Sequence, residues 1–312
     1  MADPATLVIG TRGSPLALAQ AHETQDRLAA ALGWSVEQIP LSVIKTTGDA
    51  IQDRPLSEAG GKGLFTKELD IALVECAIDL AVHSAKDLPT HIPDALVIAG
   101  YLPREDVRDA FISHRARHLN DLPAGAVVGS ASLRRQAQVK RLRPDLQVTL
   151  LRGNVGTRLK KLESGEMDAT LLAMAGLRRL GLTEHVTAVL DTDDFLPAVG
   201  QGAIAITARA GDTRVLEAIA RIVDAATGAA LAAERAFLTV LDGSCRTPIA
   251  GHARFAGEAL DFRGLVLRPD GSEGLDVAGR GAAADAEAIG REAGQDLRAR
   301  MPAGFLTGGL GA

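Results

Sequence analysis

Cysteine, aromatic residues and long apolar runs are all scarce in this chain. Its 312 residues include two cysteines, Cys76 and Cys245, which is too few for a disulfide framework, so we expect a reducing cytoplasm as its compartment. No stretch approaches the ~18 apolar residues of a membrane-spanning helix, and the N-terminus does not resemble a signal peptide. The seven histidines show no metal-ligand spacing. These absences favour a soluble globular protein with no metal and no membrane partner.

Charge is unevenly distributed along the sequence. Residues 104–179 contain 15 Lys and Arg against 8 Asp and Glu, whereas the remainder contains 19 against 31. A basic middle segment in a protein of net charge −5 indicates an anionic ligand held at one place. Nucleic acid is one candidate, but only 3% of the residues are aromatic and no recognition motif is present. A small polyanion is therefore the better interpretation.

The order of strand-like and helix-like segments predicts an α/β protein with two βα lobes and a small C-terminal α+β domain. The length suggests two or three domains, and residues 197–203 resemble a hinge between the lobes. A chain that crosses to a second lobe and returns would form a clamp around a ligand. We expect domain 1 to comprise residues 1–102 with 203–222, domain 2 residues 103–202, and domain 3 residues 223–312. Strands are expected at 7–10, 36–44, 80–84, 127–130, 147–151, 168–173, 204–206, 249–255, 260–267 and 274–281.

Two turns of the first lobe carry polar residues suited to a site. Arg12 and Ser14 open the helix after the strand at 7–10, where a helix N-terminus attracts anions, although capping alone explains Ser14. Lys86 and Asp87 follow the strand at 80–84, and ligands bind at the carboxyl edge of open α/β sheets. This pair is either a surface ion pair or part of a catalytic site.

Residues 45–63 form a long, polar, glycine-bearing segment before a helix expected at 66–77. A loop of this length in a compact domain is usually a functional lid or disordered. It is not a P-loop, because Gly63 replaces the Ser or Thr that should follow Lys62 and Leu56 replaces the first glycine. We expect a mobile lid whose Lys62 and neighbouring Phe65 close over a ligand, the alternative for Lys62 being a solvated lysine.

Three successive strand-to-helix junctions of the second lobe carry arginine. Guanidinium groups bind carboxylate or phosphate bidentately, and the amides at a helix N-terminus add to the same field. One such arginine pair is normally solvated, but several at corresponding corners of one lobe indicate an anion site. The arginines are Arg134, Arg135, Arg152, Arg158, Arg178 and Arg179.

Cys245 lies in a late turn between a helical pattern and a strand. Gly243 precedes it and Pro248 follows it, so the local geometry is restricted while the sulfur can stay accessible. Arg246 would favour the thiolate, which is the reactive form of cysteine. A buried structural cysteine is the alternative, and a polar turn is a poor place to bury one.

Taken together, seven segments resemble the porphobilinogen deaminase (hydroxymethylbilane synthase) family nearly from end to end. They are TRGSPLALAQ, GGKGLFTKEL, HSAKDLPT, GSASLRRQ, LRGNVGTRL, LPAVGQGA and DGSCRTPI. The resemblance implies two lobes like those of periplasmic binding proteins, and a third domain whose cysteine carries a covalent dipyrromethane cofactor. It implies a transferase that deaminates four porphobilinogen molecules, joins them head to tail and releases a linear hydroxymethylbilane for haem biosynthesis.

The resemblance also assigns roles to individual residues. It makes Asp87 the catalytic carboxylate and Cys245 the attachment point of the cofactor. Further cofactor contacts fall on Lys86, Ser132, Arg134, Arg135, Arg152 and Arg158. Substrate contacts fall on Arg12, Ser14, Lys62, Phe65 and Arg179. We expect a monomer that acts on porphobilinogen and binds no nucleic acid.

The chemistry of porphobilinogen agrees with these roles. Each pyrrole unit carries an acetate and a propionate, so a growing chain accumulates carboxylates that fixed arginines can bind. Loss of ammonia leaves a cation that a buried carboxylate can stabilise. Three residues depart from the family pattern: Ala131 where a hydroxyl residue is common, Ser244 where glycine is common, and Arg246 where glutamine is common. None removes the nucleophile.

A two-lobed polyanion-binding or sensor protein without turnover is the alternative function. The clamp and the arginines would fit such a protein. It would leave Asp87 and the accessible thiol of Cys245 unexplained.

Overall fold

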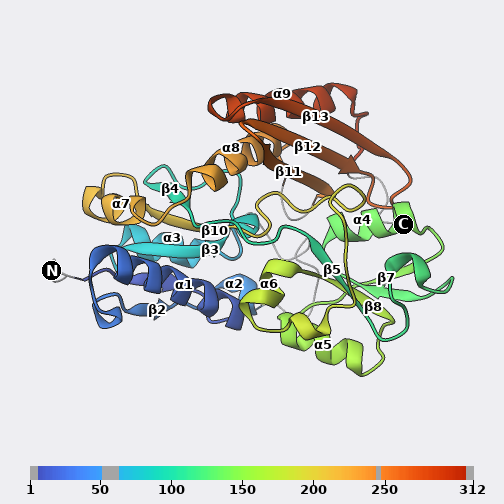
Figure 1. The fold of residues 1–312 in the computed structure, drawn as a ribbon, viewed down its shortest axis with the longest axis horizontal. Helices are drawn as coiled ribbons and strands as arrows, with labels where there is room; N and C mark the ends of the chain where they lie inside the picture. The colour runs from blue at the N-terminus through green and yellow to red at the C-terminus, as the bar shows by residue number, and fades with distance from the viewer. Residues whose placement is uncertain (1–5, 51–62, 244–246, 307–312) are drawn as a thin grey trace. The chain divides into compact units, whose positions relative to one another are not determined.

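The computed structural model of the chain describes residues 6–50, 63–243 and 247–306 (Figure 1). These residues form two five-stranded mixed sheets and one three-stranded antiparallel sheet. The chain divides into two compact units, Met1–Glu105 with Ala203–Gly228 and Asp106–Gly202 with Ala229–Ala312. The expected α/β class, with two βα lobes and a small C-terminal α+β part, is confirmed. Among the described helices, none is long and apolar enough to cross a membrane.

The first unit is built on a sheet of strand order β2-β1-β3-β10-β4. Its three neighbouring strands β2, β1 and β3 are parallel, whereas β10 runs antiparallel to both β3 and β4. Helix α1 lies along this sheet (Figure 1), and the apolar side chains of Ile9, Leu28 and Ile206 meet in the core. The strands are β1 (Ile9–Thr11), β2 (Leu41–Val43), β3 (Leu80–Ser84), β4 (Leu96–Tyr101) and β10 (Ile204–Arg209). The helices are α1 (Pro15–Leu32), α2 (Thr47–Ala50), α3 (Lys67–Val74) and α7 (Thr213–Ala220).

The second unit begins with a lobe of the same design. Its strand order is β7-β6-β8-β5-β9, with β7, β6 and β8 parallel and β5 antiparallel to its two neighbours. Each parallel strand is followed by a helix, so three helix N-termini lie at the carboxyl ends of these strands. The strands are β5 (Asp109–Ser113), β6 (Val127–Gly129), β7 (Gln147–Thr149), β8 (Ala169–Ala173) and β9 (Ala188–Val189). The helices are α4 (Leu133–Leu142), α5 (Val155–Glu163) and α6 (Met174–Arg179).

The C-terminal part places α8 and α9 on one face of the sheet β11-β12-β13 (Figure 1). Phe237 of α8 and Phe262 of β12 pack with their ring centroids 5.0 Å apart. Gly290 lets α9 approach α8 closely, because a Cβ at this position would lie 1.9 Å from the carbonyl oxygen of Ala233. The elements are α8 (Ala225–Val240), β11 (Ile249–Ala256), β12 (Ala259–Leu267), β13 (Gly274–Ala282) and α9 (Ala286–Arg300). Short 3-10 helices lie at Val36–Gln38, Ala85–Asp87, Leu119–Asp121, Thr183–His185 and Ala283–Asp285.

Three local predictions differ from the structure. The strand expected at 36–44 is a 3-10 turn followed by β2, because Ser35 caps the turn and Pro40 has no N–H for a ladder. The helix expected to run to residue 77 ends at Val74, and Cys76 lies beyond it, exposed and with φ of 60°. The segment expected to be irregular from 45 to 63 contains the short helix α2, and its residues 51–62 lie outside the described part of the chain.

Candidate active site

Asp87 stands at the carboxyl end of a buried strand. Leu80, Ala81 and Val82 of β3 are each at most 2% exposed, and the chain then turns through the 3-10 helix Ala85–Asp87. Lys86 and Asp87 are both half-buried in this turn. The position of the Asp87 carboxylate is therefore set by the sheet.

Residues from two other segments meet Asp87. The guanidinium of Arg12, which follows β1, lies 3.8 Å from Asp87, from Nη1 to Oδ2. It also lies over the ring of Phe65, 4.1 Å from the centroid. Ser14 caps α1, its Oγ accepting from the N–H of Ala17 at 3.3 Å, as expected from the sequence. Arg12, Ser14, Phe65 and Asp87 line one cavity of about 60 Å³, so the structure brings four predicted site residues together.

Two further residues of this cavity, Gln20 and His83, were not found from the sequence. Gln20 is 3% exposed, and its Nε2 donates to Ser84 Oγ at 3.0 Å. His83 Nε2 lies 2.9 Å from Thr207 Oγ1, and burial together with the positive charge of Arg12 lowers the pKa of His83 to about 4. Gln20 occurs inside an Ala- and Leu-rich helix, and His83 inside a strand. No local pattern separates them from ordinary core positions.

The arginine pair at the start of α4 is buried and ion-paired. Ser132 caps this helix, its Oγ accepting from the N–H of Arg135 at 3.4 Å. Arg134 and Arg135 are 4% and 5% exposed, and both bind the fully buried Asp109. Burial opposes ionisation of Asp109, but the two guanidinium groups outweigh it and hold the pKa of this carboxyl well below its usual range. Asp109 was also missed from the sequence, because its partners lie 25 and 26 residues away.

Of the other predicted arginines, Arg152 and Arg158 lie at the expected junction between β7 and α5, but Arg179 does not lie at the junction between β8 and α6, because it is in the last turn of that short helix. Arg152 and Arg158 flank the cap of α5, where Asn154 Oδ1 accepts from the N–H of Thr157 at 2.9 Å. Arg158 Nε donates to the carbonyl of Gly153 at 2.8 Å. Arg179, in α6, donates through Nη2 to the carbonyl of Gly202 at 3.1 Å. All three arginines are half-buried, and their roles toward a ligand stay predictions.

Two predicted site residues lie outside the described part of the chain. Lys62 belongs to residues 51–62, and Cys245 to residues 244–246 together with Ser244 and Arg246. The lid predicted at 45–63 and the reactive thiol predicted at Cys245 therefore stay predictions.

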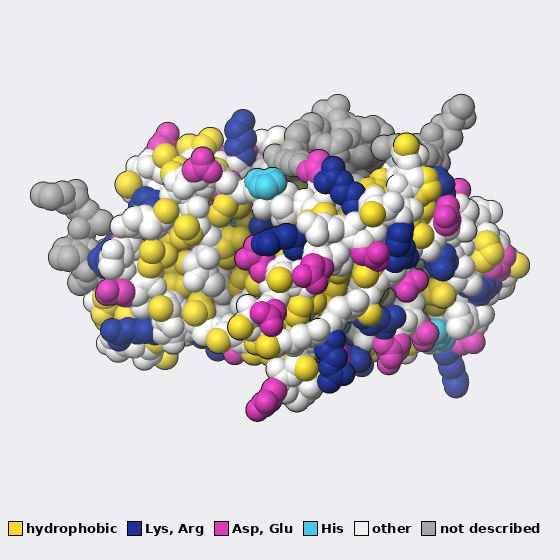
Figure 2. Space-filling view, turned by 90° about the horizontal axis from the view of Figure 1, so that it is seen from above, with side chains coloured by type: hydrophobic (Ala, Val, Ile, Leu, Met, Phe, Trp, Pro, Cys, Tyr) yellow, Lys and Arg dark blue, Asp and Glu magenta, His cyan; other side chains and the backbone are white. Residues whose placement is uncertain are grey.

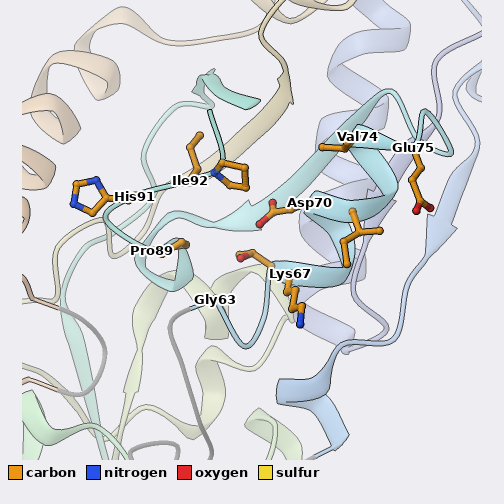
Figure 3. A pocket seen from close by; sticks show the side chains of 11 residues that line it. Gly63, Lys67, Asp70, Val74, Glu75, Pro89, His91 and Ile92 are labelled. Carbon is orange, nitrogen blue, oxygen red and sulfur yellow. The ribbon is translucent and has the colours of Figure 1, made fainter. Parts of the chain in front are cut away.

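A second, larger cavity on the first unit has a different chemical character. It measures about 620 Å³ and lies between α3 and residues 89–93 (Figure 3). Asp70 points from α3 toward Pro89 and Ile92, and burial raises the pKa of its carboxyl above the usual range. Ile71, Val74, Ile92 and the acidic Glu75 complete most of this lining. Lys67 and His91 also line this cavity, so it combines apolar side chains with charged groups of both signs and has no cluster of cations for a ligand rich in carboxylates.

The face seen in Figure 2 shows no broad basic patch, and the described residues contain no candidate metal centre. On the face seen in Figure 2, Lys and Arg side chains lie among Asp and Glu side chains. Within the described residues, no group of three or more His, Cys, Asp or Glu could hold a metal ion. Within residues 104–179, Arg134, Arg135, Arg152 and Arg158 lie around the N-termini of α4 and α5, whereas other basic residues lie in the last turns of helices.

Comparisons with known proteins agree with this arrangement. The family model described as "Porphobilinogen deaminase, dipyromethane cofactor binding domain" matches residues 7–217, and the C-terminal domain of the same enzyme matches residues 229–299. Porphobilinogen deaminase of Nitrobacter hamburgensis is 60% identical over 299 residues, covering 96% of this chain and 95% of that protein. The enzyme of Paracoccus denitrificans is 55% identical over 307 residues, covering 98% of each.

Among solved structures, the methionine binding protein MetQ matches with a TM-score of 0.45 and 14% identity, over 71% of this chain and 89% of that chain. Both family models fall on the residues that form the two lobes and the C-terminal sheet. Identities of 55–60% over nearly the whole chain leave no large region unaccounted for. The chain belongs to the porphobilinogen deaminase family.

Proposed function

We propose that this chain carries out the reaction of its family at the site that contains Asp87. Four porphobilinogen molecules would be deaminated and joined head to tail, and water would then release the linear hydroxymethylbilane. The observation that carries the proposal is the half-buried Asp87, fixed at the end of β3 and 3.8 Å from Arg12 in a shared cavity. This pair combines a carboxylate for a developing cation with a guanidinium for a substrate carboxylate.

Each addition would break one bond and form another. The C–N bond of the substrate's aminomethyl group breaks and ammonia leaves, so the methylene carbon becomes cationic. That carbon then bonds to the free pyrrole carbon of the growing chain, which loses its proton. Asp87 would stabilise the cation and accept this proton, and preorganised electrostatic partners of this kind typically contribute ~3–4 kcal/mol. Arg12, Ser14, Lys62, Phe65 and Arg179 would bind the substrate.

The residues of the second lobe fit a cofactor rich in carboxylates. When bound, dipyrromethane supplies the pyrrole carbon to which the first substrate is joined. Its four carboxylates match guanidinium forks, and the buried Nε of Arg134 has no hydrogen-bond partner among the described residues. We propose that Cys245 carries it through a thioether. Lys86, Ser132, Arg134, Arg135, Arg152 and Arg158 would hold its acid groups.

We further propose a cytoplasmic monomer with three domains. The proposed boundaries are residues 1–102 with 203–222, residues 103–202 and residues 223–312. The separate antiparallel sheet with α8 and α9 supports a third domain inside the second compact unit. A polyanion-binding protein without turnover is not supported, because the matched relatives are enzymes.

Intact mass spectrometry tests the function through the two cysteines. The parent chain should carry the added mass of dipyrromethane, because the proposed reaction builds on it. Cys245→Ser should show the polypeptide mass alone, while Cys76→Ser, which changes the exposed cysteine after α3, should keep the added mass. A parent with polypeptide mass alone, even after incubation with porphobilinogen, would sink the proposal.

A further inference from the structure

One buried carboxylate lies between the two arginines that open α4. Asp109, the first residue of β5, is 0% exposed. Its Oδ2 accepts from Arg134 Nη2 at 2.7 Å. Its Oδ1 accepts from Arg135 Nη2 at 2.6 Å and from Arg135 Nε at 3.0 Å. Two positive charges and one negative charge therefore share one interior site, which leaves a net charge of +1.

The same carboxylate is tied to the segment that follows β9. Gln201 Nε2 donates to Asp109 Oδ1 at 3.0 Å and to the carbonyl of Val107 at 2.7 Å. Arg134 Nη1 donates to the carbonyl of Leu196 at 2.7 Å. The network thus joins β5, α4 and residues 196–201: the guanidinium of Arg134 is bound by Asp109 and by Leu196, and that of Arg135 is bound by Asp109.

A pair of neighbouring arginines needs such a partner. Burial lowers the pKa of Arg134, and the nearby charge of Arg135 lowers it further, whereas Asp109 acts in the opposite direction. Without a counter-charge, the two guanidinium groups would repel each other in a site from which water is excluded. Their side chains would then adopt other positions or draw water into the lobe.

We infer that Asp109 is the positioning residue of the arginine pair: it orients both guanidinium groups and neutralises one of their charges, so that they present one net charge to a single carboxylate of the cofactor. This inference rests on the proposed function, in which Arg134 and Arg135 bind dipyrromethane. Asp109 itself would touch neither substrate nor cofactor. It acts through the two arginines.

Replacing Asp109 by Asn tests whether the orientation of the two guanidinium groups or the net charge of the site controls cofactor binding. Asp109→Asn keeps the shape of the side chain but raises the net charge of the site from +1 to +2. If net charge alone captured the carboxylate, this variant would acquire the cofactor at least as fast as the parent. If orientation decides, it should acquire the cofactor at least about tenfold more slowly, because truncating one partner of a buried charge pair disturbs the others.

The experiment follows cofactor acquisition by intact mass on the purified full-length chain, before and during incubation with porphobilinogen. Asp109→Glu restores the charge one methylene away and should fall between Asp109→Asn and the parent. Asp168→Asn is the matched control, because Asp168 pairs with Arg115 and accepts from the N–H of Val127 in the same lobe, away from α4. It should load like the parent. Far-UV circular dichroism and melting temperature report whether each variant is folded.

Each outcome is decisive. A folded Asp109→Asn that loads as fast as the parent, or faster, overturns the inference. If Asp109→Asn does not fold, Asp109→Glu decides: slower loading with a native spectrum supports the inference, and parental loading overturns it. A parent without added mass overturns the proposed function and this inference with it. A loaded parent beside an equally loaded Asp109→Asn overturns the inference alone.

Discussion

At the scale of single residues, the cavity of the candidate site combines one carboxylate and one guanidinium with a neutral histidine. Asp87 and Arg12 are both partly accessible from the cavity, with side chains 32% and 18% exposed. His83 lines the same cavity but is buried, and its low pKa keeps it neutral at pH 7. A protonated imidazole there would add a second positive charge beside Arg12 and compete with a cationic substrate for Asp87. The neutral His83 thus adds no second positive charge beside Arg12 and Asp87.

Asp87→Asn should almost abolish turnover while the chain stays folded. The amide keeps the shape but not the charge, so we expect a loss of ~3–4 kcal/mol, or roughly 10²–10³-fold in rate. Asp87→Glu keeps the charge one methylene away and should retain part of the activity. Both variants are compared with the parent by deamination rate, after intact mass has shown that all carry cofactor. Equal rates for the parent and Asp87→Asn would show that Asp87 is structural.

His83 should make the fold sensitive to mild acid. Its pKa is about 6.5 when unfolded and about 4 when folded, so its contribution is complete above pH 6.5 and is lost as the pH falls toward 4. The full contribution is about 3 kcal/mol. In urea unfolding from pH 7 to 4.5, His83→Gln should lose less stability than the parent, whereas exposed His22→Gln should behave like the parent. Superimposable pH profiles for parent and His83→Gln would contradict this expectation.

Residues whose neighbours are close in sequence could be predicted, and residues with distant partners could not. Arg12, Ser14 and Asp87 follow apolar strand patterns, and their positions at strand ends follow from that pattern alone. Asp109 looks like the ordinary polar start of a strand, because its partners are 25, 26 and 92 residues away. Gln20 and His83 are hidden in the same way. Their roles depend on Ser84 and Thr207, which lie 64 and 124 residues away.

At the scale of elements, the second lobe repeats one arrangement twice. After β6 and after β7 a turn follows, and an arginine lies in or beside the first turn of the next helix, whereas Arg178 and Arg179 lie in the last turn of α6. Ser132 and Asn154 cap α4 and α5 through their side chains, whereas α6 begins after Ala173 without a side-chain cap. Caps satisfy N–H groups within the protein, so the neighbouring arginines supply much of the charge that a bound carboxylate would meet.

The parallel strands of both lobes were predicted, but the antiparallel strands β4 and β5 were not. Each parallel strand is a short apolar run followed at once by a helical pattern, which is a local signal. β5 begins with the charged Asp109 and is paired on both sides, with β8 and β9, so it shows no alternation of polar and apolar residues. β4 pairs with β10, more than 100 residues later. Such pairing depends on contacts that a sequence window does not contain.

At the scale of the whole molecule, the second compact unit must hold two separate sheets together. Glu234, 0% exposed in α8, accepts from the N–H of Gly200 at 2.7 Å and from the N–H of Ala253 at 2.8 Å. Gly200 belongs to the segment that leaves the second lobe, and Ala253 belongs to β11. The N–H of Gly251 adds a bond to the carbonyl of Pro197 at 3.1 Å. One buried carboxylate therefore links the lobe segment to the C-terminal sheet.

Glu234→Gln should destabilise the second unit more than the first. The carboxylate of Glu234 accepts from two backbone N–H groups, but the amide of Gln has one oxygen and one NH₂ group. Its NH₂ group would therefore face one of these buried N–H groups, and leaving a buried donor without an acceptor costs about 1–3 kcal/mol. Far-UV circular dichroism follows both units during urea unfolding, whereas the single tryptophan, the partly buried Trp34, packs against the core of the first unit and reports on that unit. We expect the dichroism transition to move to lower urea and to separate from the fluorescence transition, which would mark a loss of two-state behaviour.

The exposed Glu292→Gln of α9 serves as the control and should leave both transitions together. A Glu234→Gln curve that coincides with this control by both probes would mean that Glu234 does not hold the two sheets of the second unit together.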